Sequence, residues 1–137
     1  MEKRKLGLDV GDARTGVALS DALGIIATSL GNIENSGEED LLLKLEEYIV
    51  GNDVGTVVVG MPKNMNGTVG ERGEKAKRVA EAITEKYNVK TVLWDERLTT
   101  VSAHRILSEG NVRGAKRKQK VDGLSAVLIL QGYLDSL

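Results

Sequence analysis

Acidic residues at three points of the chain could together bind metal ions. Asp9 lies between two apolar residues in a strand-like segment, where a carboxylate is destabilising unless it is paired or binds metal. Glu96 follows a second apolar run, and Asp122 precedes a third. Clustered carboxylates in a chain without cysteine suit Mg²⁺ or Mn²⁺. Because two such ions roughly 4 Å apart activate a water and stabilise a leaving oxygen, these residues predict hydrolysis of a phosphodiester.

Each carboxylate also has a structural interpretation. Asp9 could belong to a turn that begins at the following glycine. Asp95, Glu96 and Arg97 could form an ion-pair cluster at the surface. Asp122 could complement the N-terminus of the last helix, which is the stronger interpretation for this residue taken alone. The metal-site interpretation is favoured for Asp9 and, less strongly, for Glu96.

Basic and polar residues near these carboxylates could hold a nucleic-acid backbone. The loop 60–67 can place Lys63 near a phosphate, although it lacks the Gly-Lys-Ser/Thr ending of a nucleotide P-loop, and a plain connector is the alternative. Residues 113–120 contain five basic residues and no acidic residue, which favours a backbone clamp over a solvated loop at this position. The predicted contacts are Lys63, Asn66, Arg97, Arg113, Lys116, Arg117, Lys118 and Lys120. Thr99 and Thr100 are expected to cap a short helix or, with Asp95, to support the site.

The composition limits the class of protein. The chain has 137 residues, of which 41% are apolar and 28% charged, as is typical of one soluble domain, expected to span 1–137. The absence of cysteine favours a reducing compartment. The charged start is unlike a signal peptide, and apolar runs are too short to span a bilayer, so we expect a cytoplasmic protein without membrane contact. The net charge of −1 means that positive charge for phosphate binding must be local.

Hydrophobic patterns predict an α/β fold in the order βββαβαβαα. Ser36 and Glu39 form a capping-box pattern, which predicts that the first helix starts there, and Gly51 is expected to end it. The other elements are expected as strands at 5–10, 17–20, 25–33, 54–60 and 89–95, and as helices at 76–87, 100–108 and 121–134. Strands one, four and five should be parallel, strands two and three should form an antiparallel flank, and helices should cover both faces. Asp9 and Glu96 should then meet at one edge of the sheet, where ligands bind in such folds.

Four blocks of the sequence resemble the YqgF/RuvX family and cover nearly the whole length. They lie at residues 8–21, 60–67, 95–100 and 121–134. The resemblance implies a ribonuclease H-like fold related to the RuvC junction resolvases. It also implies that Asp9, Glu96 and Asp122 are the acidic metal-binding positions, with Arg14 close to the site. Two positions depart from the family pattern: Ser125 replaces a frequent alanine, and Gly123 is expected to weaken the start of the last helix.

The resemblance implies one of two nucleic-acid substrates. The favoured one is precursor 16S ribosomal RNA, whose 5′ end would be matured, and the other is a four-way DNA junction. Weak overall positive charge suits help from a partner such as the ribosomal particle. Resolution of a two-fold junction would need a homodimer, so both monomer and homodimer stay open. Two other functions are an ATPase of the actin/Hsp70 kind, suggested by residues 9–16, and a non-catalytic assembly factor that binds ribosomal RNA.

Overall fold

The computed structural model describes residues 3–64, 66–98 and 123–137. Its elements are β1 (Arg4–Val10), β2 (Arg14–Ser20), β3 (Ala27–Glu34), α1 (Glu38–Ile49), β4 (Val54–Met61), α2 (Glu71–Tyr87), β5 (Lys90–Asp95) and α5 (Leu124–Asp135). The strands form one sheet in the order β3-β2-β1-β4-β5. As predicted, β1, β4 and β5 are parallel, and β2 and β3 form an antiparallel flank. The helix predicted at 100–108 lies outside the described residues.

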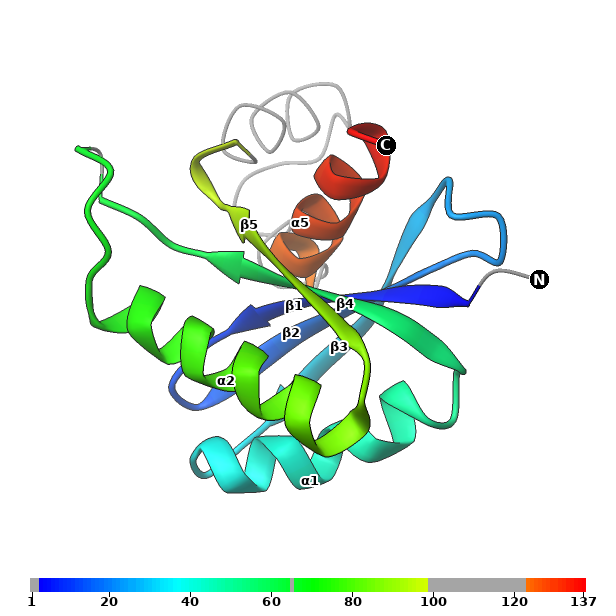
Figure 1. The fold of residues 1–137 in the computed structure, drawn as a ribbon, viewed down its shortest axis with the longest axis horizontal. Helices are drawn as coiled ribbons and strands as arrows, with labels where there is room; N and C mark the ends of the chain where they lie inside the picture. Colours follow the sequence, from blue (N-terminus) through cyan, green and yellow to red (C-terminus); the bar gives the residue numbers. More distant parts are fainter. Residues whose placement is uncertain (1–2, 65, 99–122) are drawn as a thin grey trace, which may run out of the picture.

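Helices cover both faces of the sheet, which confirms the predicted mixed α/β architecture (Figure 1). Alternate residues of the central strands divide the core between the two faces. On the face covered by α1 and α2, large aliphatic side chains fill the interior, namely Leu6, Leu8, Val57, Val59, Leu41, Leu45, Val79 and Ile83. On the face covered by α5, the buried side chains include Ala18, Val58, Ala126, Ile129 and Leu130.

Helix α5 lies directly on the backbone of the central strands because glycines face it. A Cβ atom added at Gly7 of β1 would lie 2.7 Å from the Cβ of Leu130 and 2.9 Å from the carbonyl oxygen of Ala126. On β4, a Cβ at Gly60 would collide with Ile129 of the same helix. The sheet face under α5 therefore has no room for larger side chains at these two positions.

The start of α5 requires the glycine that the sequence analysis expected to weaken it. Gly123 is the N-cap residue, with φ of 75°, and the helix begins at Leu124, three residues later than predicted. A Cβ at Gly123 would lie 2.7 Å from the Oγ of Ser29 and 2.8 Å from the carbonyl oxygen of Gly31. Positive φ and close contact both favour glycine here. The expectation for Gly123 was wrong because this residue precedes the helix.

Two other local predictions, the start of α1 and the start of β2, were also wrong. The capping box fails because Gly37, with φ of 117°, is the N-cap of α1 and no side chain caps it. The backbone N–H of Ser36 instead donates to Asp40 Oδ2 at 2.9 Å. Strand β2 begins at Arg14, three residues earlier than predicted, because pairing with β1 and β3 extends it through Arg14 and Thr15.

We predict that Gly7→Ala lowers the free energy of unfolding by about 1–3 kcal/mol, because its methyl group would collide with the backbone and first side-chain carbon of α5. Gly55→Ala is the control in a neighbouring strand, since its added Cβ would lie 2.8 Å from the Cβ of Lys3, an exposed residue before β1 that can shift, whereas Leu130 and Ala126 belong to a packed helix. Urea unfolding of both variants measures the effect. Equal stability of the two variants would contradict the close approach of α5.

Candidate active site

Two carboxylates from distant parts of the chain meet beside β4. Asp9, on β1, and Glu96, directly after β5, are half-buried and joined by a side-chain hydrogen bond. Gly60 of β4 lies beneath them, because a Cβ there would be 3.1 Å from Glu96 Cγ. The backbone N–H of Glu96 donates to the carbonyl oxygen of Met61 at 3.1 Å, which fixes the chain after β5. The structure thus brings Asp9 and Glu96 together at the edge where the parallel strands end.

Burial makes it unfavourable for this pair to carry two negative charges. Burial raises the pKa of Asp9, whereas the positive charge of Arg72 and hydrogen bonds with Ser125 and Glu96 lower it in part. Burial, together with the negative charge of Asp9, raises the pKa of Glu96 to about 7, against the opposing charge of Arg72. In the absence of a cation, Glu96 is therefore still partly protonated near neutral pH, where an ordinary glutamate is ionised.

Two residues of this site were missed by the sequence analysis. Ser125, in the first turn of α5, hydrogen-bonds to Asp9, and its only signal in the sequence was the departure from the family's alanine. Arg72, in the first turn of α2, acts on both carboxylates through its charge. No motif marks Arg72, because its position depends on how α2 packs against the sheet.

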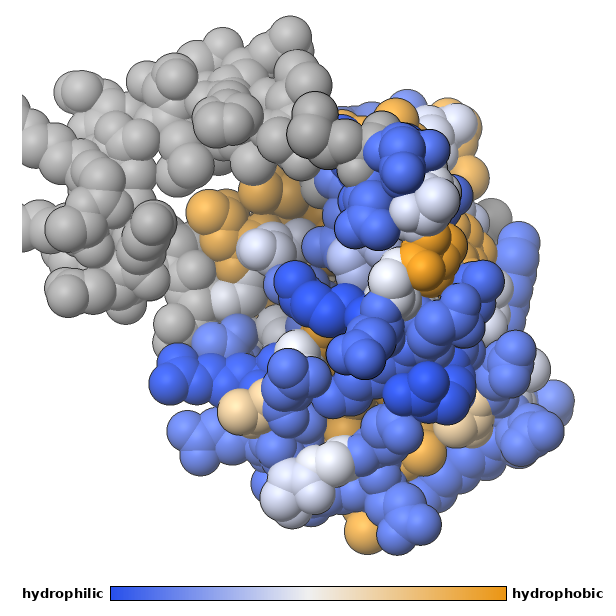
Figure 2. Space-filling model, turned by 90° about the vertical axis from the view of Figure 1, so that its left-hand side faces the viewer, coloured by the Kyte–Doolittle hydropathy of each residue, from blue (hydrophilic) through white to orange (hydrophobic). Residues whose placement is uncertain are grey.

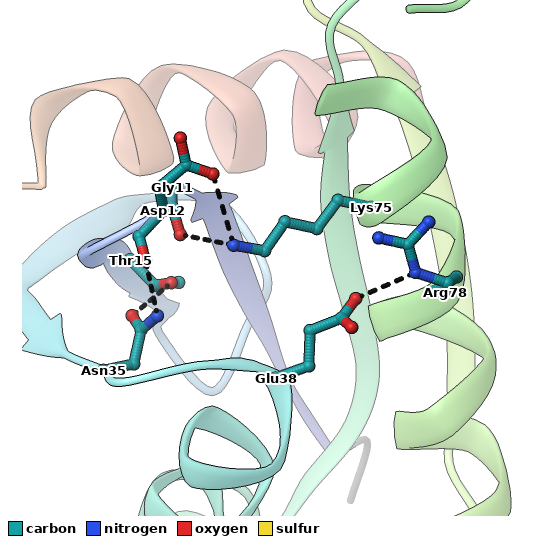
Figure 3. Close-up of polar contacts among 7 residues, drawn as sticks. All are labelled: Gly11, Asp12, Thr15, Asn35, Glu38, Lys75 and Arg78. Atoms are coloured by element: carbon teal, nitrogen blue, oxygen red, sulfur yellow. Dashed lines mark hydrogen bonds and ion pairs between the residues drawn. The ribbon is translucent and has the colours of Figure 1, made fainter. Parts of the chain in front are cut away.

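The turn that follows Asp9 accepts hydrogen bonds from two other segments of the chain (Figure 3). From α2, Lys75 Nζ donates to the carbonyl oxygen of Gly11 at 3.2 Å and lies 3.4 Å from Asp12 Oδ1. From the segment between β3 and α1, Asn35 Nδ2 donates to the carbonyl oxygen of Asp12 at 3.5 Å. Asn35 Oδ1 also accepts a hydrogen bond from the buried hydroxyl of Thr15 at 3.0 Å. These contacts fix the turn relative to the end of β1, where Asp9 lies.

The neighbouring acidic residue forms an ion pair of its own. Arg97 donates to Asp95 Oδ2 at 3.0 Å through Nε and at 2.7 Å through Nη2. This guanidinium holds the pKa of Asp95 below its usual range. The surface ion-pair interpretation therefore describes Asp95 and Arg97, but not Glu96.

The other predicted site residues in the described part of the chain are Lys63, Asn66 and Arg14. Lys63 acts on Asp95 through its charge. Asn66 Oδ1 accepts hydrogen bonds from the backbone N–H and hydroxyl of Thr68, so it shapes its own loop. Arg14 is exposed at the start of β2 and lines a hollow of about 470 Å³ beside Lys44, and it is not among the groups that shift the pKa of Asp9 or Glu96.

Several predicted residues lie outside the described residues, namely Thr99, Thr100, Arg113, Lys116, Arg117, Lys118, Lys120 and Asp122. Within 3–64, 66–98 and 123–137, no group of three or more His, Cys, Asp or Glu side chains is placed to hold a metal ion. The described part of the site thus contains two neighbouring carboxylates, Asp9 and Glu96. None of the helices in these ranges is both long and apolar enough to cross a membrane.

Solved structures define the fold class. The RuvC protein of T. thermophilus, in complex with a Holliday junction substrate, superposes with a TM-score of 0.69 at 11% identity, covering 98% of this chain and 95% of that one. The fowlpox virus Holliday junction resolvase gives 0.56 at 10% identity, covering 98% and 99%. At such identities the likeness concerns the fold alone, which is the ribonuclease H-like fold of RuvC.

The sequence comparisons define the family. The family model described as "RuvX: Holliday junction resolvase" matches residues 3–136. A relative from Bacillus subtilis is 49% identical over 136 residues, covering 98% of this chain and 99% of that protein, and carries the name "Putative pre-16S rRNA nuclease". A relative of the same name from Thermoanaerobacter pseudethanolicus is 48% identical over 134 residues, covering 97% and 96%. The chain belongs to the RuvX family, which confirms the resemblance seen in its four sequence blocks.

The raised pKa of Glu96 predicts how the metal-free protein responds to pH. Between the ordinary glutamate pKa of 4.5 and about 7, the folded state keeps a proton that the unfolded state releases. The contribution of Glu96 to the free energy of unfolding therefore falls as pH rises through that range. We expect Glu96→Gln to reduce the fall in melting temperature between pH 5 and pH 8, measured with a chelator present. Glu81→Gln, at an exposed position of α2, is the control, and parallel curves for wild type and Glu96→Gln would contradict the assignment.

Proposed function

We propose that this protein is a divalent-metal-dependent nuclease that hydrolyses nucleic-acid phosphodiesters. Asp9, Glu96 and Asp122 are its proposed catalytic and metal-binding carboxylates. The observation that carries the proposal is the contact between Asp9 and Glu96, two half-buried acids brought together from β1 and the end of β5. The relatives named as ribosomal RNA nucleases and the family described as junction resolvases support the same reaction class.

The donor set fits a hard cation. Asp9 and Glu96 offer carboxylate oxygens at one point, and the chain has no thiolate ligand. Such oxygen ligands suit Mg²⁺ or Mn²⁺, and we propose two ions. Bound ions would activate a water and stabilise the leaving oxygen of the phosphodiester. Ser125 orients the carboxylate of Asp9 by a hydrogen bond, and the proton that Glu96 partly retains near neutral pH would be released on metal binding.

For the substrate, we propose precursor 16S ribosomal RNA first and a four-way DNA junction second. The names of relatives at 48–49% identity support the RNA, and the family description supports the junction. Maturation of an RNA end requires one active site, whereas cleavage of a two-fold junction requires a homodimer. We infer that the protein works in the cytoplasm, with the ribosomal particle as the proposed partner that presents the RNA.

We predict that Asp9→Asn and Glu96→Gln each lower cleavage by roughly 100-fold or more, because each removes a charged oxygen ligand from the site. Melting temperature should stay the same or rise, since each change removes a buried charge. The measurement is incubation with Mn²⁺ and two labelled substrates, a 5′ fragment of precursor 16S RNA and a four-way DNA junction. The control is Asp53→Asn, the same chemical change as Asp9→Asn. Asp53 lies directly before β4, at the end of that strand away from the two acids.

The outcomes separate the candidate functions. Cleavage of one substrate by wild type and Asp53→Asn, but not by the site variants, would support the nuclease and identify its substrate. Full cleavage by Asp9→Asn would contradict the site. Failure of folded, metal-bound wild type to cleave either substrate would favour the assembly-factor alternative, or a nuclease that requires the assembled particle.

The basic residues at 113–120 are proposed to clamp the nucleic-acid backbone. We predict that Lys116→Ala combined with Lys118→Ala weakens binding and lowers the salt slope of log Kd by up to about two, because each phosphate contact contributes about 0.7–0.9 to the slope. Lys3→Ala with Lys90→Ala is the charge-matched control, since both residues lie at the amino ends of β1 and β5, away from the carboxylates. An unchanged slope in the first double variant would exclude the clamp.

A further inference from the structure

A cation on α2 lies close enough to the carboxylate pair for its charge to act on both acids, yet it forms no ion pair with either in the described part of the chain. The charge of Arg72 acts on both Asp9 and Glu96. Yet among residues 3–64, 66–98 and 123–137, Arg72 takes part in no ion pair within 4.0 Å. Its side chain is exposed. Its guanidinium donors are therefore accessible to a ligand that approaches the two acids.

The first turns of α2 are fixed to both strands that carry the site. A Cβ at Gly73 would lie 2.9 Å from the carbonyl oxygen of Pro62 and 3.2 Å from Met61 Sδ, so the first turn packs tightly on the end of β4. One turn later, the side chain of Lys75 is only 16% exposed and reaches the carbonyl oxygen of Gly11, after β1. Arg72 directly precedes Gly73 and lies three residues before Lys75, so the packing of this part of α2 sets the position of its backbone relative to the end of β1.

Charged side chains of both signs surround Arg72. Arg72, Lys75 and Arg78 line a hollow of about 580 Å³ together with Asp12, Val69, Gly70, Glu71 and Glu74. The side of the molecule that carries the start of α2 is largely hydrophilic (Figure 2). Lys75 is bound to Gly11 and Asp12, and Arg78 Nε donates to Glu38 at 3.1 Å, as Figure 3 shows. Of these three cations, Arg72 is the one without a partner in the described part of the chain.

We propose that Arg72 is a substrate-binding residue of the nuclease, whose guanidinium binds the non-bridging oxygens of the phosphate placed at Asp9 and Glu96. This inference rests on the proposed function and adds a residue to its site. A guanidinium presents parallel N–H donors that match two phosphate oxygens, and it remains charged at every working pH. Its fixed position also draws the phosphate toward a point where the two acids alone would repel it.

The experiment compares Arg72→Ala and Arg72→Lys with Arg78→Ala, an arginine on the same helix whose guanidinium is bound to Glu38. Binding of the labelled precursor 16S fragment and of the four-way junction is measured with Ca²⁺, a divalent ion that also binds carboxylate oxygens, in place of Mn²⁺ and over a range of monovalent salt concentrations. We expect Arg72→Ala to weaken binding of one of these substrates roughly 10- to 100-fold and to lower its salt slope by about one. Arg72→Lys should keep the slope but recover only part of the affinity, because an ammonium group does not bind two oxygens in parallel. Arg78→Ala should change neither quantity by more than about twofold.

Cleavage in Mn²⁺ and melting temperature, measured on the same variants, separate this inference from the proposed function. An unchanged salt slope in Arg72→Ala would overturn the inference, even if cleavage or melting temperature fell. The effect of the arginine would then come from its charge beside the two acids and not from a phosphate contact. If the wild-type protein cleaves and Arg72→Ala cleaves as fast as Arg78→Ala, the inference would also be overturned, but the proposed nuclease function would stand. If the wild-type protein cleaves neither substrate but Arg72→Ala still lowers the salt slope of binding, the result would support Arg72 as a phosphate contact and count against the nuclease. Absence of wild-type binding to both substrates would overturn both.

Discussion

The contact between Asp9 and Glu96 is the constraint on which the arrangement of this molecule depends. The two acids come from β1 and from the residue after β5, and β4 lies between those strands. Their side chains can meet only because Gly60 of β4 leaves the space above it open. A half-buried acid pair is less stable than apolar side chains of the same volume. The sequence nevertheless places it over a sheet whose opposite face is filled by large aliphatic residues, which points to a use for the pair beyond packing.

The two faces of the sheet are built by different means, and the site depends on that difference. Leucine and valine side chains separate the sheet from α1 and α2. On the other face, Gly7 and Gly60 allow α5 to approach the strand backbone. Close approach is what brings Ser125 of α5 within hydrogen-bonding distance of Asp9. A larger residue under α5 would move the helix away and separate the hydroxyl from the carboxylate, so packing and site geometry are coupled here.

The sequence was sufficient for features that follow from local patterns and connection rules. Apolar runs and crossover handedness predicted the parallel set of strands, and hence the meeting of Asp9 with Glu96. Side-chain alternation also explains why Glu96 and not Asp95 joins Asp9, since Trp94 packs toward α5 and its neighbour Asp95 must point to the other face. Features that depend on packing between distant segments were missed or wrong. Arg72 and Ser125 reach the site only because of how their helices are placed. Gly37, and not Ser36, is the N-cap of α1, because the chain adopts a positive φ there that no local pattern indicated.

The electrostatics of the site separate hydrolysis from simple binding. A protein that only holds RNA gains from positive charge at the contact surface, yet this chain has a net charge of −1 and presents two acids at the point in question. Arg72 supplies one positive charge against two carboxylates, so it cannot by itself make the point attractive to a phosphate when both are ionised. A proton on Glu96 relieves the excess near neutral pH, but a protonated acid binds metal poorly and contributes little to hydrolysis. Bound divalent cations would remove the conflict, because both acids would then be held in their charged form and the phosphate would be attracted rather than repelled. The acid pair is thus unfavourable for a passive binding factor and useful to a cation-dependent nuclease.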